Sequence, residues 1–355
     1  MEYYKCVVIM VSIIGIYSSF NVYEVKRNRF SFILIFIVLG SLLAFRDQFV
    51  GVDTGRYYLT YTSTKSMNFE QVVSIREGAN IGYFLLNAVC SKIGMSFQLF
   101  VSILSIWIVF STLFVYKKTY SLDIFAIFGY LGLGVYTFCF SGLKQAISMS
   151  FIIWSVYFLW KAKAWYAYVM FVAAFLFHPV AIVFLPFLFL RKITFSYMHI
   201  IMIVVGFLIL FLFRYQIAYF ITLMFAENYI GHYESKETVG GSFIFLIINT
   251  LFFVFLFKDK VKENNTVEKD IFLMLIIASA LQLLSSYAYA FTRVNLFYMQ
   301  FVPIALSMMF RYEHSTVKRM IIFSLLIADC YMCYNLFYGH IIGEQLEEYS
   351  LLKNF

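Results

Sequence analysis

Charged residues are scarce in this chain: they make up 13% of its 355 residues, whereas hydrophobic residues make up 63%. A soluble globular domain carries about 25% charged residues, so this composition excludes an ordinary soluble protein. Proline is also rare, with three residues. Long apolar runs stand between short charged segments, and the alternating segments of about 10 residues that are typical of membrane β-strands are missing. The sequence therefore predicts an all-α, polytopic integral membrane protein.

Several signatures of soluble enzymes are missing as well. Neither G-x-x-x-x-G-K-[ST] nor G-x-G-x-x-G occurs, which argues against nucleotide hydrolysis and dinucleotide chemistry. The five cysteines lie mostly inside apolar runs, where no disulfide framework is needed. Few carboxylates or histidines apart from Asp47 and Asp53 fall on the predicted outer face, so we expect no essential metal ion and no cofactor.

The excess of basic residues gives the chain a net charge of +8. In a soluble protein this charge would suggest a nucleic-acid partner. Here the basic residues stand in small groups at the ends of apolar runs, a pattern typical of membrane orientation by cytoplasmic lysine and arginine. It is not the footprint of a phosphate backbone, and we expect no nucleic-acid partner.

These basic groups predict the topology. We expect about twelve spans with both termini outside, in a single membrane domain of residues 1–355 with outer loops at residues 46–96 and 214–240. Residues 81–90 are too few to cross about 30 Å of hydrocarbon, and we expect them to form an amphipathic helix at the outer interface. The later basic groups then lie on the cytoplasmic side, beginning with Lys117 and Lys118, Lys161 and Lys163, and Arg191 and Lys192.

Three segments in the middle of the chain carry distinct expectations. Residues 122–140 form one outward span, and residues 145–160 return inward. The apolar run of residues 180–190 is short. Pro179 precedes it and Pro186 interrupts it, which predicts a broken or tilted helix.

Six ionisable residues are not explained by membrane orientation. All are expected at or just inside the outer ends of spans, where insertion of a charge costs about 2.5 to 3.5 kcal/mol, so such groups tend to be paired or functional. We predict that they converge on one face. They are Arg46, Asp53, Arg56, Lys144, His178 and Arg293.

Two roles remain open for each of four of these residues. Lys144 precedes a helix in FSGLKQAISMSF and either holds a phosphate together with the helix N-terminus or extends to the interface. His178 either exchanges a proton with substrate or is a packed histidine. Asp53 is either a general base or the partner of a neighbouring arginine. Arg293 either clamps a pyrophosphate or stacks on tyrosines.

Five short motifs follow one another along the chain: RDQFVGVDTGRYYLTY from Arg46, NIGYFLLN, SGLKQAIS, FHPVAIVFLP and FTRVNLFY. With these motifs the chain resembles the EpsG-type members of the Wzy-like polysaccharide polymerases. Such proteins commonly show arginine before glutamine in the middle motif, where this sequence has Lys144 before Gln145. The layout also looks like that of the lipid-phosphate-sugar glycosyltransferases of the GT-C type.

The resemblance implies a polymerase on the outer face of the bacterial cytoplasmic membrane. It would transfer a growing glycan from undecaprenyl pyrophosphate to a lipid-linked repeat unit, alone or with a chain-length regulator. The implied sites comprise catalytic Arg46, Arg56 and either Asp53 or His178, pyrophosphate-binding Arg56, Lys144 and Arg293, and sugar-binding Tyr57, Tyr58, Tyr61 and Gln145.

Two alternatives stay open at the level of sequence. One is a GT-C-type transferase that adds a single sugar from a polyprenyl phosphate. The other is a non-catalytic transporter or flippase for lipid-linked oligosaccharide, which should carry charges at the bilayer midplane instead of at the outer ends of spans.

Overall fold

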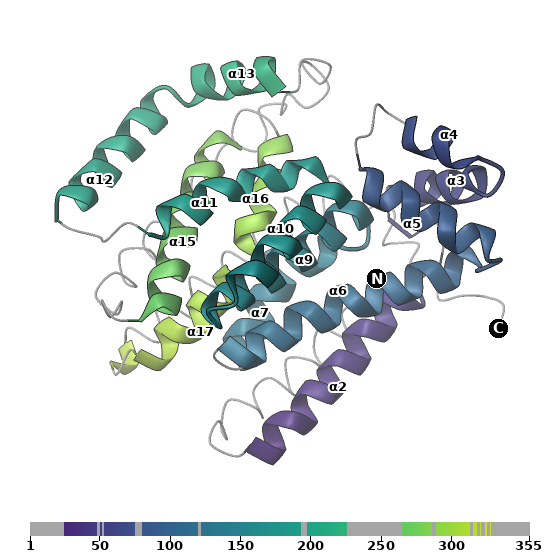
Figure 1. Ribbon diagram of the computed structural model, residues 1–355. Helices are drawn as coiled ribbons and strands as arrows, with labels where there is room; N and C mark the ends of the chain where they lie inside the picture. Colours follow the sequence, from purple (N-terminus) through teal and green to yellow (C-terminus); the bar gives the residue numbers. More distant parts are fainter. Residues whose placement is uncertain are drawn as a thin grey trace. The chain divides into compact units, whose positions relative to one another are not determined.

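The computed structural model describes residues 25–47, 50–51, 53–74, 80–119, 122–192, 197–225, 265–285, 289–312, 315–317, 320, 324 and 327. The chain forms two compact units, Met1–Ile182 with Cys333–Phe355, and Val183–Met332. Every regular element in the described residues is a helix (Figure 1), which confirms the all-α prediction. That the chain is one membrane domain stays a prediction.

The described helices of the first unit begin with a long helix, continue with three short ones, and end with long helices around a short broken segment. They are α2 (Val25–Ala44), α3 (Thr54–Thr64), α4 (Phe69–Ser74), α5 (Ile81–Lys92), α6 (Phe97–Thr119), α7 (Ile124–Gly132), α8 (Val135–Phe138), α9 (Leu143–Trp160) and α10 (Ala164–Phe177).

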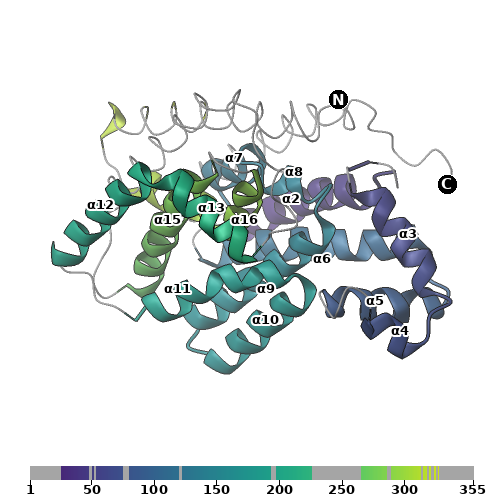
Figure 2. The ribbon, with the colours of Figure 1, turned by 90° about the horizontal axis from the view of Figure 1, so that it is seen from above.

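The long helices of this unit pack in an ordered series. Helix α2 packs along α6, α6 along α9, and α9 along α10 (Figures 1 and 2). Two reciprocal hydrogen bonds join α6 to α9: the Trp107 indole donates to Ser150 Oγ at 2.8 Å, and the Trp154 indole donates to Ser111 Oγ at 2.9 Å. Because both partners advance by four residues, α6 and α9 run in the same direction.

The α9–α10 pair is antiparallel and close. Ser148 and Ser155 of α9 donate to the carbonyl oxygens of Ala174 and Ala167 of α10, at 2.7 and 2.8 Å. Small polar residues of this kind let apolar helices approach each other and hydrogen-bond across their interface.

Helices α6 and α9 are long and apolar enough to cross a membrane, and the bent pair Val205–Leu212 and Arg214–Leu223 would make a third crossing if it is one span. This finding covers the described residues alone. It supports a membrane protein of helical type, while the count of twelve spans and the GT-C-like layout stay predictions.

The predicted span of residues 122–140 is not one helix. It divides into α7 and α8 at Leu133 and Gly134, and Gly134 has φ of 81°, a conformation that glycine adopts without a Cβ penalty. Hydropathy does not register such a break because the apolar run continues through it.

The predicted break lies where the first unit ends, at Ile182, and the second begins, at Val183. A 3₁₀ helix, η2 (Pro179–Phe184), leads into the short α11, so the expectation of a broken helix beside Pro179 is confirmed. The described helices of the second unit are α11 (Leu185–Leu190), α12 (Tyr197–Leu212), α13 (Arg214–Phe225), α15 (Thr266–Leu284), α16 (Tyr289–Met299) and α17 (Val302–Tyr312).

The expected outer loop at residues 214–240 begins with a helix, and its place outside the membrane stays a prediction. Residues Arg214–Phe225 form α13, and the Val205–Leu212 and Arg214–Leu223 segments are bent by 76°. Arg214 lies at this bend, donates from Nη1 to Phe211 O at 2.7 Å and stacks on the rings of Phe211 and Tyr215. Arg214 therefore marks the bend between two helices.

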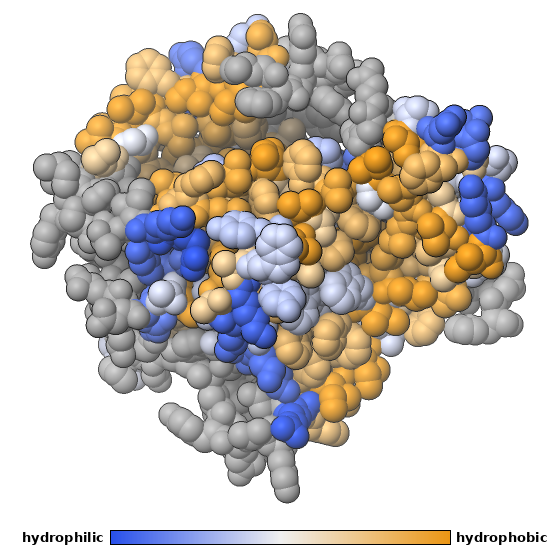
Figure 3. Space-filling model, in the orientation of Figure 1, coloured by the Kyte–Doolittle hydropathy of each residue, from blue (hydrophilic) through white to orange (hydrophobic). Residues whose placement is uncertain are grey.

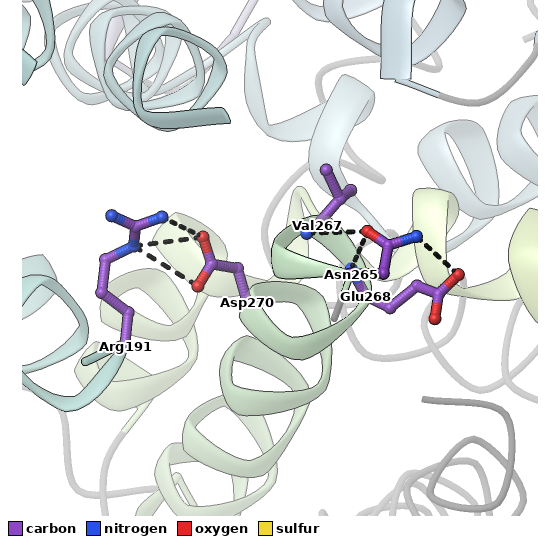
Figure 4. Close-up of polar contacts among 5 residues, drawn as sticks. All are labelled: Arg191, Asn265, Val267, Glu268 and Asp270. Carbon is purple, nitrogen blue, oxygen red and sulfur yellow. Dashed lines mark hydrogen bonds and ion pairs between the residues drawn. The ribbon is translucent and has the colours of Figure 1, made fainter. Parts of the chain in front are cut away.

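A partly buried ion pair joins the residue after α11 to α15 (Figure 4). Arg191 Nη2 lies 2.7 Å from Asp270 Oδ2, and Arg191 Nε donates to both oxygens of the carboxylate. Asn265 caps α15 next to it: its Oδ1 accepts from the backbone amides of Val267 and Glu268, and its Nδ2 donates to Glu268 Oε1. This reciprocal cap satisfies amides that the helix itself leaves without partners.

Candidate functional site

The start of α5 is the centre of the candidate site. Gly82 lies against the last turn of α10, since a Cβ at this position would be 3.1 Å from the Phe177 ring and 3.2 Å from the Leu176 backbone. The next two residues, Tyr83 and Phe84, are buried and point to the other side of this contact, toward α9. The NIGYF motif therefore links the end of α10 to the start of α9.

The loop after α2 docks on the turn before α9. Gly51 has φ of 107°, and a Cβ there would lie 2.1 Å from the Phe140 carbonyl oxygen, so a side chain is excluded by both strain and space. Thr54 Oγ1 donates to the carbonyl oxygens of Val50 at 2.9 Å and Phe140 at 3.4 Å. This docking brings the GVDTGRYY motif to SGLKQ.

Lys144 lies where these elements meet. It is the second residue of α9, and its ammonium is 5.6 Å from the centroid of the Tyr57 ring and 5.7 Å from those of Tyr83 and Phe84. The side chain is half-buried. A helix N-terminus repels a cation, and three ring faces offset that repulsion. An anion placed here would gain from the ammonium and from the helix amides together.

Two buried polar groups of α5 were not singled out from the sequence. Tyr83 and Asn87 are fully buried on one face of α5, and neither the Tyr83 hydroxyl nor Asn87 Oδ1 makes a hydrogen bond in the described part of the chain. Burial raises the pKa of Tyr83, the nearby Tyr57 adds to the rise, and Asn87 opposes it. The neutral phenol beside Lys144 is thus a hydrogen-bond donor. Helical spacing of four residues was the signal that could have paired them.

Arg46 is buried, with 1% of its surface exposed. Its Nη1 donates to Leu43 O at 2.7 Å, in the last turn of α2, and to Ser105 Oγ of α6 at 3.3 Å. Its guanidinium also lies 5.6 Å from the Phe140 ring centroid. A cation at the C-terminus of a helix is stabilised by the helix dipole. These contacts therefore give Arg46 a structural role: it caps the end of α2 and joins it to α6.

Three of the five motifs and the start of the fourth, FHPVAIVFLP, lie in the first unit. The sequence matches a family model over residues 29–351, nearly the whole chain. The chain belongs to the EpsG family. This is a family of Wzy-like polysaccharide polymerases, and the resemblance inferred from the motifs is confirmed. No curated protein and no solved structure matches the chain.

The other EpsG-motif residues of α3 divide between surface and interior. Arg56 and Tyr58 are exposed, and Asp53 is half-buried at the N-cap of α3. Tyr57 and Tyr61 are buried: the Tyr57 ring meets Tyr83 at 5.8 Å, and the Tyr61 hydroxyl donates to Met95 O at 2.8 Å. The two buried rings hold α3 in place. Tyr58 is the exposed ring of this set and packs edge-on with Phe97 at a centroid distance of 5.4 Å.

The remaining EpsG-motif residues of the first unit lie at the ends of α9 and α10. Gln145 is buried in the first turn of α9. His178 is half-buried and extended at the end of α10, where its N–H donates to Ala174 O at 2.9 Å and its Nδ1 accepts from the Val180 amide at 3.4 Å. Since Gly82 contacts the residues just before His178, the histidine lies on the same side of α5 as the end of α10.

Arg293 belongs to the second unit, where it is half-buried in α16. Its predicted convergence with the residues of the first unit stays a prediction. Nearby on α16, Asn295 donates to Gln282 Oε1 of α15 at 2.8 Å. Within the described ranges no three histidine, cysteine, aspartate or glutamate residues are grouped so that they could hold a metal ion.

Proposed function

We propose that this EpsG-family protein polymerises a polysaccharide by moving the growing glycan from undecaprenyl pyrophosphate to a lipid-linked repeat unit, on the outer face of the bacterial cytoplasmic membrane. Family membership and the apolar helices support a membrane protein of polysaccharide polymerisation. The donor, the transfer step and the membrane face are parts of the proposal.

The observation that carries the proposal is the position of Lys144. Its ammonium lies at a helix N-terminus, half-buried, within 5.7 Å of three rings that come from α3 and α5. A pyrophosphate leaving group develops negative charge as its bond to the sugar breaks. Fixed positive charge in a site with little water stabilises that charge in the transition state.

The transfer step needs few groups. The oxygen of the acceptor hydroxyl attacks the anomeric carbon of the growing chain, and the bond from that carbon to the pyrophosphate oxygen breaks, with the electron pair leaving on the pyrophosphate. Lys144 and Arg56 neutralise the leaving group. Arg293 is proposed as a further pyrophosphate ligand. The Tyr83 phenol is placed to donate to one of the phosphate oxygens.

Two residues are candidates for the base that takes the proton of the acceptor hydroxyl, and we assign this role to Asp53. Asp53 stands one helical turn before Tyr57, whose ring contacts Lys144. His178 Nδ1 faces the Val180 amide, so its neutral form would carry its proton on Nε2 and have no free lone pair there. Tyr58 and Gln145 would contact the sugars.

The test replaces Lys144 in cells that lack the native gene. With Lys144→Ala we expect loss of long-chain polysaccharide on gels and accumulation of lipid-linked single repeat units, because removing one stabilising charge typically costs about 10²- to 10³-fold in rate. Lys144→Arg keeps the charge and should retain polymer.

Lys92→Ala is the matched control, because Lys92 is an exposed lysine at the far end of α5. Immunoblotting of membranes should show equal amounts of all variants. Polymer of normal length from Lys144→Ala would overturn the proposal. Products longer by one sugar would favour a single-sugar transferase, and repeat units trapped on the inner leaflet would favour a flippase.

A further inference from the structure

The end of the first unit away from Lys144 carries four lysines, each placed over an aromatic ring. They come from the last turn of α6 and from the turn between α9 and α10. The distances from ammonium nitrogen to ring centroid are 4.7 Å for Lys117 over Phe32, 5.6 Å for Lys118 over Phe114, 5.6 Å for Lys161 over Tyr157 and 5.8 Å for Lys163 over Tyr166.

The rings under these lysines form a continuous row across four helices, α2, α6, α9 and α10. Each neighbouring pair of rings is in contact, at centroid distances between 5.4 and 6.4 Å. The row consists of Phe32, Phe110, Phe114, Tyr157, Phe158 and Tyr166. We call these rings and the four lysines the lysine–aromatic surface. In Figure 3, hydrophilic and pale residues lie side by side over this part of α6, α9 and α10.

The charge of this surface is unbalanced. Arg29 and Lys118 both repel the charge of Lys117. Between residues 101 and 192 the sequence holds one acidic residue, Asp123. That carboxylate is buried and caps α7, where it accepts from the amides of Phe125 and Ala126.

Helix dipoles explain only part of the arrangement. Lys117 and Lys118 stand in the last turn of α6, where a cation is favoured. Lys163 stands at the N-cap of α10, where a cation is disfavoured. It stays exposed there, next to Trp165 and Tyr166, which are 75% and 55% exposed. An external anion near Lys163 would reverse the unfavourable sign of the charge at this helix end.

We propose that the lysine–aromatic surface binds the anionic headgroups of phospholipids. Two rings of the row, Tyr157 and Tyr166, and the neighbouring Trp165 are of the residue types that lie at headgroup level. Basic side chains near an anionic membrane surface are attracted to it. Further along α10 the exposed residues become apolar, with Val169 and Val172 at 41% and 54% exposed. A surface that passes from lysine through aromatic to aliphatic residues matches a lipid from its phosphate to its acyl chain.

The test measures lipid bound to the full-length protein in detergent by native mass spectrometry. The protein is titrated with dioleoylphosphatidylglycerol or dioleoylphosphatidylcholine. For Lys161→Gln/Lys163→Gln we expect affinity for phosphatidylglycerol to fall by about tenfold or more, with phosphatidylcholine binding unchanged.

The control variant is Lys65→Gln/Lys92→Gln, which removes two exposed lysines at the ends of α3 and α5. It should bind phosphatidylglycerol like the native protein. An equal loss in both double variants, or none in the first, would overturn the proposal. Full displacement of phosphatidylglycerol by millimolar inorganic phosphate would overturn it too, because it would identify a free anion as the ligand. All three proteins should elute alike in size-exclusion chromatography.

Discussion

One helix pair in each unit shows a different means of joining. In the first unit α6 and α9 are joined by neutral contacts, the reciprocal indole–hydroxyl bonds of Trp107 and Trp154, and the lysines stand at the helix ends. In the second unit a partly buried charge pair, Arg191 with Asp270, joins the end of α11 to α15. A basic residue at the end of an apolar run therefore has no fixed meaning. Whether such a residue orients the chain in the membrane, stabilises the fold or binds a ligand depends on the group that it contacts.

The largest effect that would test this contrast is expected in the second unit. Asp270→Asn should destabilise the protein, because it leaves the Arg191 guanidinium without its anion; breaking a fully buried pair costs about 3 to 5 kcal/mol, and the 20% exposure of the Arg191 side chain sets the loss below that range. Arg191→Met/Asp270→Leu should restore most of the loss. Thermal unfolding followed by circular dichroism measures both. A double variant as unstable as the single one would show that the pair also serves something other than its own charge balance.

The next effect concerns the docking of the loop after α2 in the first unit. Gly51→Ala should cost about 1 to 3 kcal/mol, since the new Cβ would overlap the Phe140 carbonyl oxygen. Polymer should be lost with it, because α3 would move away from Lys144. Gly55→Ala is the control: it lies in α3 with open space around it, and it should be neutral or stabilising. Equal behaviour of the two variants in the unfolding assay would refute the docking.

A smaller effect is expected for the neutral contacts between α6 and α9. A double-mutant cycle of Trp107→Phe and Ser150→Ala should give a coupling energy of about 0.5 to 1.5 kcal/mol. The same cycle on Trp154 and Ser111 should give a similar value. Coupling near zero in both cycles would mean that ring packing alone holds the two helices together.

The smallest effect on stability should follow Tyr83→Phe. Its buried hydroxyl makes no hydrogen bond in the described residues, so removing it should change the free energy of unfolding by less than about 0.5 kcal/mol or raise it. Shorter polysaccharide chains from this stable variant would indicate that the hydroxyl acts on substrate. Normal chains would leave the ring as the part of Tyr83 that matters.

Local signals predicted much of the fold. The helix over residues 145–160, the short helix over 81–90 and the break beside Pro179 are all present, because apolar length and proline act within a few residues. The break at Gly134 was missed since the apolar run continues through it. Arg214 was read as the start of a loop because charge alone does not distinguish a helix bend from a helix end.

The site was predictable in its parts and less so in their arrangement. Lys144 stood out as a cation beside a helix start, and the structure places it against two motifs that are distant in the sequence. That Tyr57 is buried while Tyr58 is exposed follows from helix phase, which needs the packing partner α5 to fix it. The pairing of Arg191 with Asp270 spans 79 residues and leaves no local pattern.

The reciprocal tryptophan–serine bonds also fix the position of α9 along α6, because sliding α9 by one turn would break both bonds together. The 18 residues of α9 are about 27 Å long, close to the thickness of a bilayer's hydrocarbon core. Lys144 stands at one end of this helix and Lys161 at the other. If headgroups hold the Lys161 end, the depth of Lys144 in the opposite leaflet is set from across the membrane. A change of bilayer thickness would then shift Lys144 relative to the substrate that we propose it binds.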